Sequence, residues 1–188
     1  MNTINENHLV EMRKIEDQLF FYDMNHWLEY EILTWQWWML AVFLILPWII
    51  WFLLVKRDNI IQALLFGMFI IIITKLLDVV GLQYGVWEYP IQLFPVIPRG
   101  LPFDISMVPV AYMLLYQYFN TWKTFFIAQV LMALLYAFIG EPFSEWAHVV
   151  QYMKWHYILS FFYYILVGAG TRFLLLKLIS MQKISSIN

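Results

Sequence analysis

Long apolar runs alternate with short polar breaks over most of the chain. Residues 32–55 contain no Asp, Glu, Lys or Arg. A helix needs about 20 apolar residues to cross roughly 30 Å of hydrocarbon, so this run predicts a transmembrane helix at about residues 36–55. Pro47 lies near its middle, where it is expected to remove one backbone hydrogen bond.

Four later runs have similar length and also predict membrane helices. Short polar or Gly-Pro breaks separate them, and no internal repeat relates them. The chain is therefore predicted to be all-α, an integral membrane helical bundle with about five transmembrane helices in one domain at residues 35–180. The four later helices are expected at about residues 60–82, 104–119, 124–140 and 156–176.

Prolines are expected to interrupt the helices in two places. Four prolines fall within residues 83–103, and proline lacks a backbone donor and fixes φ, so this segment predicts an irregular lid at the membrane interface. Gly140-Glu141-Pro142 is expected to end the fourth helix, because the residue before a proline is disfavoured in the α region. Residues 143–153 then predict a short interfacial helix.

The first 34 residues carry polar and apolar positions at helical spacing. Leu9, Met12, Ile15 and Leu19 mark an apolar face, and acids outnumber bases. We predict an amphipathic helix at residues 5–34 that lies in the interface or contacts a protein partner or a second copy of the chain. The excess of acids favours a protein contact or a cap over the bundle, because anionic lipids attract basic segments. Residues 181–188 are expected to form a C-terminal tail.

The distribution of Lys and Arg predicts the orientation. The side of the predicted spans that is richer in these residues is expected to face the cytoplasm. This orientation puts the C-terminus inside, and the N-terminal helix, the lid and residues 141–153 outside. The richer side carries Lys56, Arg57, Lys123, Arg172, Lys177 and Lys183, and the other side carries Arg99 and Lys154.

The composition agrees with a membrane location and excludes several classes of function. The chain is 63% hydrophobic and 13% charged, whereas a soluble domain is about 45–50% apolar and about 25% charged. A net charge of -2 without a basic run argues against nucleic-acid binding. The absence of cysteine rules out disulfides and thiolate sites. We expect no cofactor and no metal.

Lys75 and Asp78 are the most informative residues of the second predicted span. A charge at the centre of a membrane helix costs about 2.5–3.5 kcal/mol, so such residues face the protein interior and find partners. Their separation of three positions puts them on one helix face. Two interpretations stay open: an internal ion pair, or a polar pocket in which Asp78 takes part and Lys75 contacts an anionic ligand.

Further acids reach the same outer boundary in the predicted topology. Asp104 and Glu141 join Asp78 there, and clustered acids in a dry pocket suit acid–base chemistry or cation binding. Asp104 has a simpler alternative role as the N-cap of the third span. Glu145 and His148 have the E-x-x-H spacing of some metal sites, and with Glu141 would share one helix face. We expect hydrogen bonding there, because a second copy of the motif is missing.

From Tyr84 onward, a little over half of the chain resembles small multi-pass membrane proteins of spore-forming Gram-positive bacteria, a family without an assigned activity. The residues that carry the resemblance are YPIQLFPVIP at 89–98, LPFDISMVPVAYMLLYQY at 101–118, TWK at 121–123, FIGEP at 138–142 and W-x-Y-I-x-S-F at 155–161. The resemblance implies a bacterial cytoplasmic membrane and five spans. It also implies that Asp104, Glu141, Pro142, Trp155 and Ser160 belong to a shared pattern.

These patterns favour a pocket at the outer face that binds a lipid-like or aromatic small molecule, or a membrane partner. The alternative is an intramembrane enzyme that acts on a lipid or isoprenoid with Asp78, Asp104 and Glu141 as acid–base residues. A transporter or channel is disfavoured, because few polar residues lie along any helix. The expected pocket residues are Lys75, Asp78, Trp87, Glu88, Arg99, Asp104, Tyr112, Glu141, Glu145, His148, Trp155 and Ser160.

Overall fold

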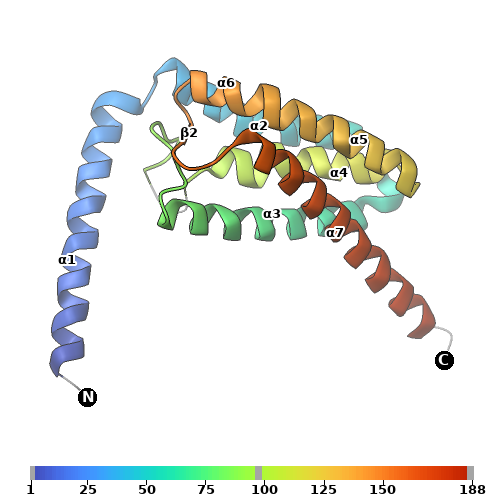
Figure 1. Cartoon of the computed structure of the whole chain (residues 1–188), viewed down its shortest axis with the longest axis horizontal. Coiled ribbons are helices and arrows are strands. Elements are labelled where there is room, and N and C mark those ends of the chain that lie inside the picture. Colours follow the sequence, from blue (N-terminus) through green and yellow to red (C-terminus); the bar gives the residue numbers. More distant parts are fainter. Residues whose placement is uncertain (1–2, 96–98, 186–188) are drawn as a thin grey trace.

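The computed structural model describes residues 3–95 and 99–185, and these residues are mostly helical (Figure 1). Pro98 of the predicted lid and the last three residues of the predicted tail lie outside them. The α-helices are α1 (Thr3–His26), α2 (Trp35–Leu54), α3 (Ile60–Gln83), α4 (Val108–Tyr118), α5 (Trp122–Leu135), α6 (Glu141–Trp146) and α7 (Tyr157–Ser185). The remaining elements are the π-helical segments η1 (Trp27–Glu31), η3 (Phe103–Met107) and η4 (Tyr136–Gly140), the 3-10 turn η2 (Arg57–Asn59), and the strands β1 (Trp87–Glu88) and β2 (Gln151–Tyr152).

Among the described residues, four helices are long and apolar enough to cross a membrane. Each exceeds the length needed for the hydrocarbon core and buries only a minority of its residues inside the protein, which leaves apolar surface for lipid. The prediction of an all-α membrane bundle is confirmed. The four helices are Trp35–Leu54, Arg57–Gln83, Trp122–Trp146 and Tyr157–Gln182.

The predicted third span is also helical, but it has a different character from the other four. The segments η3 and α4 pack against α2, α3 and α5, and most of the α4 side chains are buried. Tyr112, Tyr116 and Gln117 are buried there, and they lower the apolar character of the helix. This segment is a central helix surrounded by protein, so it does not need a lipid-facing apolar surface.

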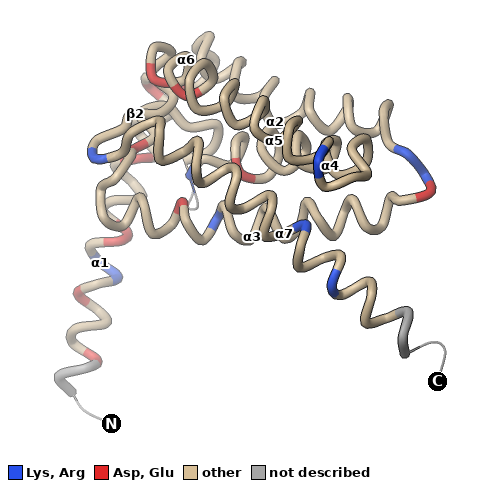
Figure 2. Tube along the Cα trace, turned by 45° about the vertical axis from the view of Figure 1, so that its right-hand side comes forward, with Lys and Arg blue, Asp and Glu red and all other residues tan. Residues whose placement is uncertain are grey.

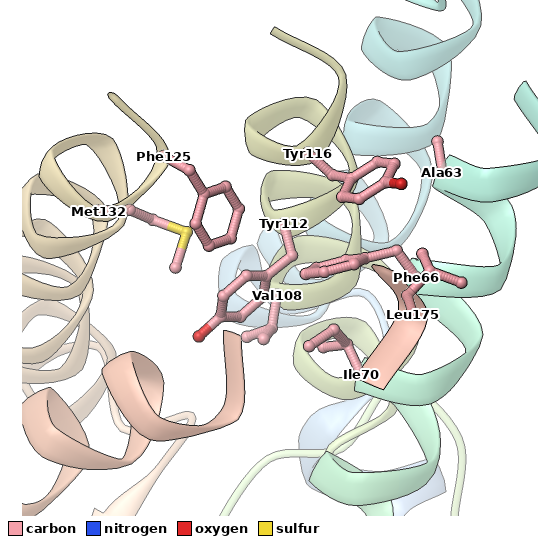
Figure 3. Packing of buried hydrophobic residues seen from close by; sticks show 9 residues of the cluster. All are labelled: Ala63, Phe66, Ile70, Val108, Tyr112, Tyr116, Phe125, Met132 and Leu175. Carbon is pink, nitrogen blue, oxygen red and sulfur yellow. The ribbon is translucent and has the colours of Figure 1, made fainter. Parts of the chain in front are cut away.

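A cluster of apolar and aromatic side chains joins α3, α4, α5 and α7. Phe66 stacks on Tyr116 with ring centroids 4.9 Å apart, and Phe125 meets Phe66 edge-on at 6.2 Å. Figure 3 shows Val108 and Ile70 beside the same rings. The central helix is therefore held by ring packing between helices, since lipid tails give no hydrophobic drive for helices to associate.

The predicted end of the fourth helix at Gly140-Glu141-Pro142 is wrong. Helix α5 continues through the π-helical η4 into α6, which ends at Trp146. Pro142 lies at the point where η4 passes into α6, and it does not end the helix. Residues 143–153 therefore do not form a separate interfacial helix. They finish α6, turn, and form β2, which pairs antiparallel with β1 in the register Trp87–Tyr152 and Glu88–Gln151.

The N-terminal helix leaves the bundle. Figure 1 shows α1 crossing the direction of the bundle helices and extending away from them, and nearly all of its described side chains are exposed. The helix ends at η1, short of the predicted residue 34, because Leu33 has a φ of 62° and Thr34 caps α2. Trp27 holds the junction to the lid by donating to the Gln92 carbonyl at 3.0 Å.

The lid and the α6–β2 connection lie at one end of the bundle, and the basic connection between α2 and α3 lies at the other (Figures 1 and 2). The chain thus brings the two proline-containing segments together, which positions the site described next. Helix α7 runs past the predicted span and continues as far as Ser185, through the start of the predicted tail.

Candidate functional site

A cavity of about 210 Å³ lies beneath the lid, and we call it the lid cavity. Side chains from α2, α3, the lid, η3, α4, η4, α6, β2 and α7 line it. Its polar lining residues are Thr74, Asp78, Tyr89, Asp104, Tyr136, Glu141, Ser144, Tyr152, Ser160, Tyr163 and Tyr164, and Phe43, Trp87, Phe103, Phe143 and Trp155 add further aromatic surface. Acids from three separate parts of the chain therefore share one cavity.

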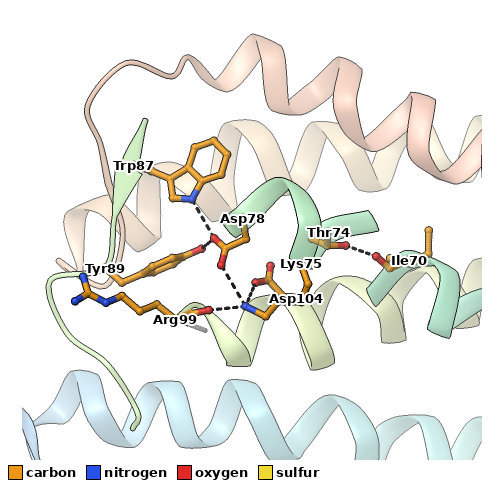
Figure 4. Close-up of polar contacts among 8 residues, drawn as sticks. All are labelled: Ile70, Thr74, Lys75, Asp78, Trp87, Tyr89, Arg99 and Asp104. Atoms are coloured by element: carbon orange, nitrogen blue, oxygen red, sulfur yellow. Dashed lines mark hydrogen bonds and ion pairs between the residues drawn. The ribbon is translucent and has the colours of Figure 1, made fainter. Parts of the chain in front are cut away.

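Lys75 joins two of these acids. Figure 4 shows its ammonium between the carboxylates of Asp78 and Asp104. The Nζ–Oδ2 distances are 3.1 Å and 2.7 Å, and Lys75 also donates to the carbonyl of Arg99 at 2.5 Å. An ammonium has three N–H groups, and these three acceptors satisfy them all. The predicted contact of Lys75 with an anionic ligand is therefore not supported, whereas the predicted internal ion pair is present.

Asp78 also anchors the lid. Its Oδ1 accepts from the Trp87 indole at 3.0 Å and from the Tyr89 hydroxyl at 2.7 Å, so both oxygens of this buried carboxylate are satisfied (Figure 4). Burial and the two nearby carboxylates raise the pKa of the Tyr89 hydroxyl well above its ordinary value, so it remains a donor. Gly81 permits the arrangement, because a side chain at that position would overlap the Trp87 ring.

Asp104 lies inside its helix. Its backbone N–H already donates to Gly100, and no side chain caps this helix start. The predicted N-cap role is therefore wrong. The Asp104 carboxylate turns inward to Lys75 instead, because an ionised group buried next to a cation is more stable than one left alone.

Glu141 lines the same cavity and forms no hydrogen bond or ion pair with the side chains of this cluster. It is 8% exposed, and its Oε1 accepts from the Tyr164 hydroxyl at 3.1 Å. Its Oε2 is buried without a hydrogen-bond partner among the described residues. The buried positions Ala133, Ala137 and Glu141 follow one another at four-residue spacing through η4. A π-helical turn holds about one extra residue, so it keeps Glu141 in this inward-facing row.

Aromatic side chains also line the cavity. The Trp87 and Trp155 rings meet edge-on with centroids 5.2 Å apart, and Trp155 donates to Ser160 at 2.7 Å. The Tyr163 hydroxyl is buried without a partner among the described residues. Burial, with help from Glu141 and Glu145, raises the pKa of the Tyr152 hydroxyl, which therefore stays protonated.

Five other expected pocket residues lie outside the lining. Arg99 pairs with Asp23 of α1 at 2.7 Å and with Glu88 at 3.5 Å, so these charges fasten α1 to the lid. Tyr112 is in the core between helices and donates to the Tyr164 carbonyl. The last two, Glu145 and His148, face away from the cavity lining.

His148 does not share a helix face with Glu141 and Glu145 in the way that the spacing predicted. Helix α6 ends at Trp146, and His148 is exposed with a φ of 57°. Glu145 instead accepts from the Tyr157 hydroxyl and from the backbone N–H of Tyr152. Within residues 3–95 and 99–185, no group of three or more His, Asp and Glu side chains is arranged to hold a metal ion.

The polar lining residues that the sequence did not single out are mainly tyrosines. The spacing of Ser160, Tyr163 and Tyr164 at i, i+3 and i+4 was a usable signal, because those positions share a helix face. Tyr89 and Tyr152 gave no such signal, since Tyr89 directly follows β1 and Tyr152 lies on β2, and these two strands pair only in the folded chain.

No protein-family model, curated protein or solved structure matches this chain. The resemblance to a membrane family of spore-forming bacteria therefore stays a prediction.

Proposed function

We propose that the protein binds a small amphiphilic molecule, with the polar head in the lid cavity and the apolar tail between the helices or in the surrounding lipid. The observation that carries this proposal is the single cavity lined by Asp104, Glu141 and a set of aromatic rings from distant parts of the chain. A mostly apolar space with a few convergent polar groups is the usual composition of a ligand site.

The size of the cavity supports an amphiphile over a whole aromatic ligand. Its volume of about 210 Å³ is smaller than the roughly 300–1,000 Å³ of sites that enclose drug-sized molecules. A head group of a few non-hydrogen atoms fits this space, and a long chain does not. The tail of the ligand would lie against the exposed apolar surfaces of the helices.

Photolabelling tests the proposal. A fatty alcohol that carries a diazirine next to its hydroxyl should label the cavity segments of α6 and α7 saturably. Ser144→Leu should abolish this labelling, because Ser144 lines the cavity and its hydroxyl bonds only to Gly140 of its own helix. Ser180→Leu is the matched control, since Ser180 is exposed and bonds to Lys177 in the same way. Labelling that is equal in both variants would reject the proposal.

Intramembrane catalysis is a second candidate function. It is supported by the carboxylates of Asp104 and Glu141, which come from different elements and line one cavity, as a general acid and a general base require. Purified protein in vesicles of its host's lipid extract should then change the lipid profile by mass spectrometry, and Asp104→Asn should stop that change. An unchanged profile leaves binding as the function.

We also propose that the lid end faces the outside of a bacterial cytoplasmic membrane, because Lys56, Arg57 and Lys123 lie in the connections at the other end. The chain contains no cysteine, so single cysteines can be introduced without a background. A membrane-impermeant maleimide should label Lys154→Cys in intact cells and should label Lys56→Cys only after the cells are opened. The reverse result would invert the topology.

A further inference from the structure

We infer that the head group bound in the lid cavity is a primary ammonium, and that Glu141 is its counter-ion. This inference rests on the proposed binding function and names the class of ligand. It depends on three features of the cavity: its charge balance, its unpartnered polar atoms and its aromatic walls.

Acidic side chains outnumber basic ones in and beside the lid cavity. Asp78 and Asp104 share the single cation Lys75, and Arg99 is occupied outside the cavity by Asp23 and Glu88. No Lys or Arg in the described part of the chain forms an ion pair with Glu141. The carboxylates of the lining thus outnumber the cations beside them, and buried carboxylates without compensation are costly. A bound cation relieves that cost, and an anion increases it.

The unpartnered atoms show where a cation would bind. Glu141 is more than nine-tenths buried, lines the cavity, and has one oxygen without a partner in the described residues. The Tyr163 hydroxyl also lines the cavity and is buried without a hydrogen-bond partner in the described residues. Both oxygens accept hydrogen bonds. A primary ammonium offers three N–H donors, whereas a quaternary ammonium offers none. These acceptors therefore favour the primary amine.

The aromatic walls favour an organic cation over a metal ion. The faces of Trp and Tyr rings attract cations and contact the methylene groups beside them, but they do not replace the water shell of a metal ion. Trp87, Trp155 and Tyr164 supply such rings around the space between the acids. The residues that the structure describes hold no set of three side chains suited to a metal, so an alkylammonium group matches the lining better.

Two sources could supply this chemistry: a free long-chain amine or the ethanolamine head of a phospholipid.

A titration with three probes tests the inference. Dodecylamine, dodecyltrimethylammonium and dodecanol share a C12 chain and differ only in the head group. Each is titrated into the protein in phosphatidylcholine nanodiscs. Dodecylamine should bind about 10-fold or more tighter than dodecanol, as expected for a charge-assisted hydrogen bond. Dodecyltrimethylammonium should fall between them. If the phospholipid is the natural ligand, adding phosphatidylethanolamine to the nanodiscs should weaken dodecylamine binding by competition. If a free amine is the natural ligand, the added phospholipid should leave dodecylamine binding unchanged.

Glu141→Gln should bring the ratio of the dodecanol Kd to the dodecylamine Kd close to one, with little change in the dodecanol Kd itself. Glu145→Gln is the matched control, because it lies one turn further along α6 with its carboxylate outside the cavity lining, and the preference should persist. If dodecanol binds the wild type as tightly as dodecylamine, the ammonium assignment is wrong and the binding function stands. If no probe binds saturably, both fail. The wild-type series decides the matter even if Glu141→Gln does not fold.

Discussion

The lid cavity holds two acidic regions, and they differ in how many of their carboxylate oxygens have hydrogen-bond partners. In the Lys75–Asp78–Asp104 cluster, every N–H of the ammonium has an acceptor, and Asp78 accepts from three side chains. Glu141 accepts a hydrogen bond from Tyr164 on one oxygen, and its other oxygen has no partner among the described residues. Both regions are buried and both contain carboxylates. The difference indicates that the first region holds the lid in place, while the second is available to a ligand.

Burial alone therefore does not identify a functional acid in this bundle. A buried carboxylate whose oxygens are all occupied is part of the scaffold, because moving it would break several hydrogen bonds at once. A buried carboxylate with a vacant oxygen pays the cost of desolvation without full compensation. Four substitutions test this division between scaffold and site.

The largest effect is expected from Asp78→Ala. This change leaves Lys75 without one carboxylate and leaves Trp87 and Tyr89 without their acceptor. Removing one member of a buried charged network costs about 3–5 kcal/mol. The free energy of unfolding in detergent should fall by that amount, whereas Asp58→Ala, in the exposed turn η2, should leave it unchanged. A loss below about 1 kcal/mol would mean that Asp78 is not part of the scaffold.

Lys75→Met is expected to cost somewhat less, about 2–3 kcal/mol, because Lys75 is partly exposed while its loss leaves two buried carboxylates without a cation. Adding Asp104→Asn should recover part of this loss, since one of the two uncompensated charges is removed. The same unfolding measurement on the single and double variants tests the coupling. A double variant less stable than Lys75→Met would contradict it.

Glu141→Gln should change the free energy of unfolding by no more than about 1 kcal/mol in either direction. The Tyr164 hydroxyl can still donate to the amide oxygen, and the vacant oxygen is replaced by an amide nitrogen of similar size. Asp78→Asn, measured in parallel, should be far more destabilising. Equal losses in the two variants would remove the distinction between the two acidic regions.

The smallest effect is expected from Arg99→Ala, which breaks the pair with Asp23 that fastens α1 to the lid. Both side chains are partly exposed, and such pairs contribute about 0–1 kcal/mol, so global stability should hardly change. Proteolysis within α1 should nevertheless become faster, because the helix has few other contacts with the bundle. Lys154→Ala, at the same end of the bundle, is the control and should leave the cleavage rate unchanged.

Some features of the site followed from local spacing. The three-residue spacing of Lys75 and Asp78 put them on one helix face, and of the two interpretations left open by the sequence the ion pair is present. The position of Glu141 followed from no such rule, because a π-helical segment precedes it and changes the register. The predicted shared face of Glu141, Glu145 and His148 assumed a regular helix through residue 148, and the chain turns before it.

The sequence alone determined that this chain forms long membrane helices, because hydropathy is a sum over neighbouring residues and the hydrocarbon core sets the length that the sum must cover. Only the tertiary structure decided which acids have hydrogen-bond partners on both carboxylate oxygens. The partners of Asp78 come from the lid and the partner of Glu141 comes from α7. Hydrogen bonds act over about 3 Å, so they depend on folding that brings these distant segments together.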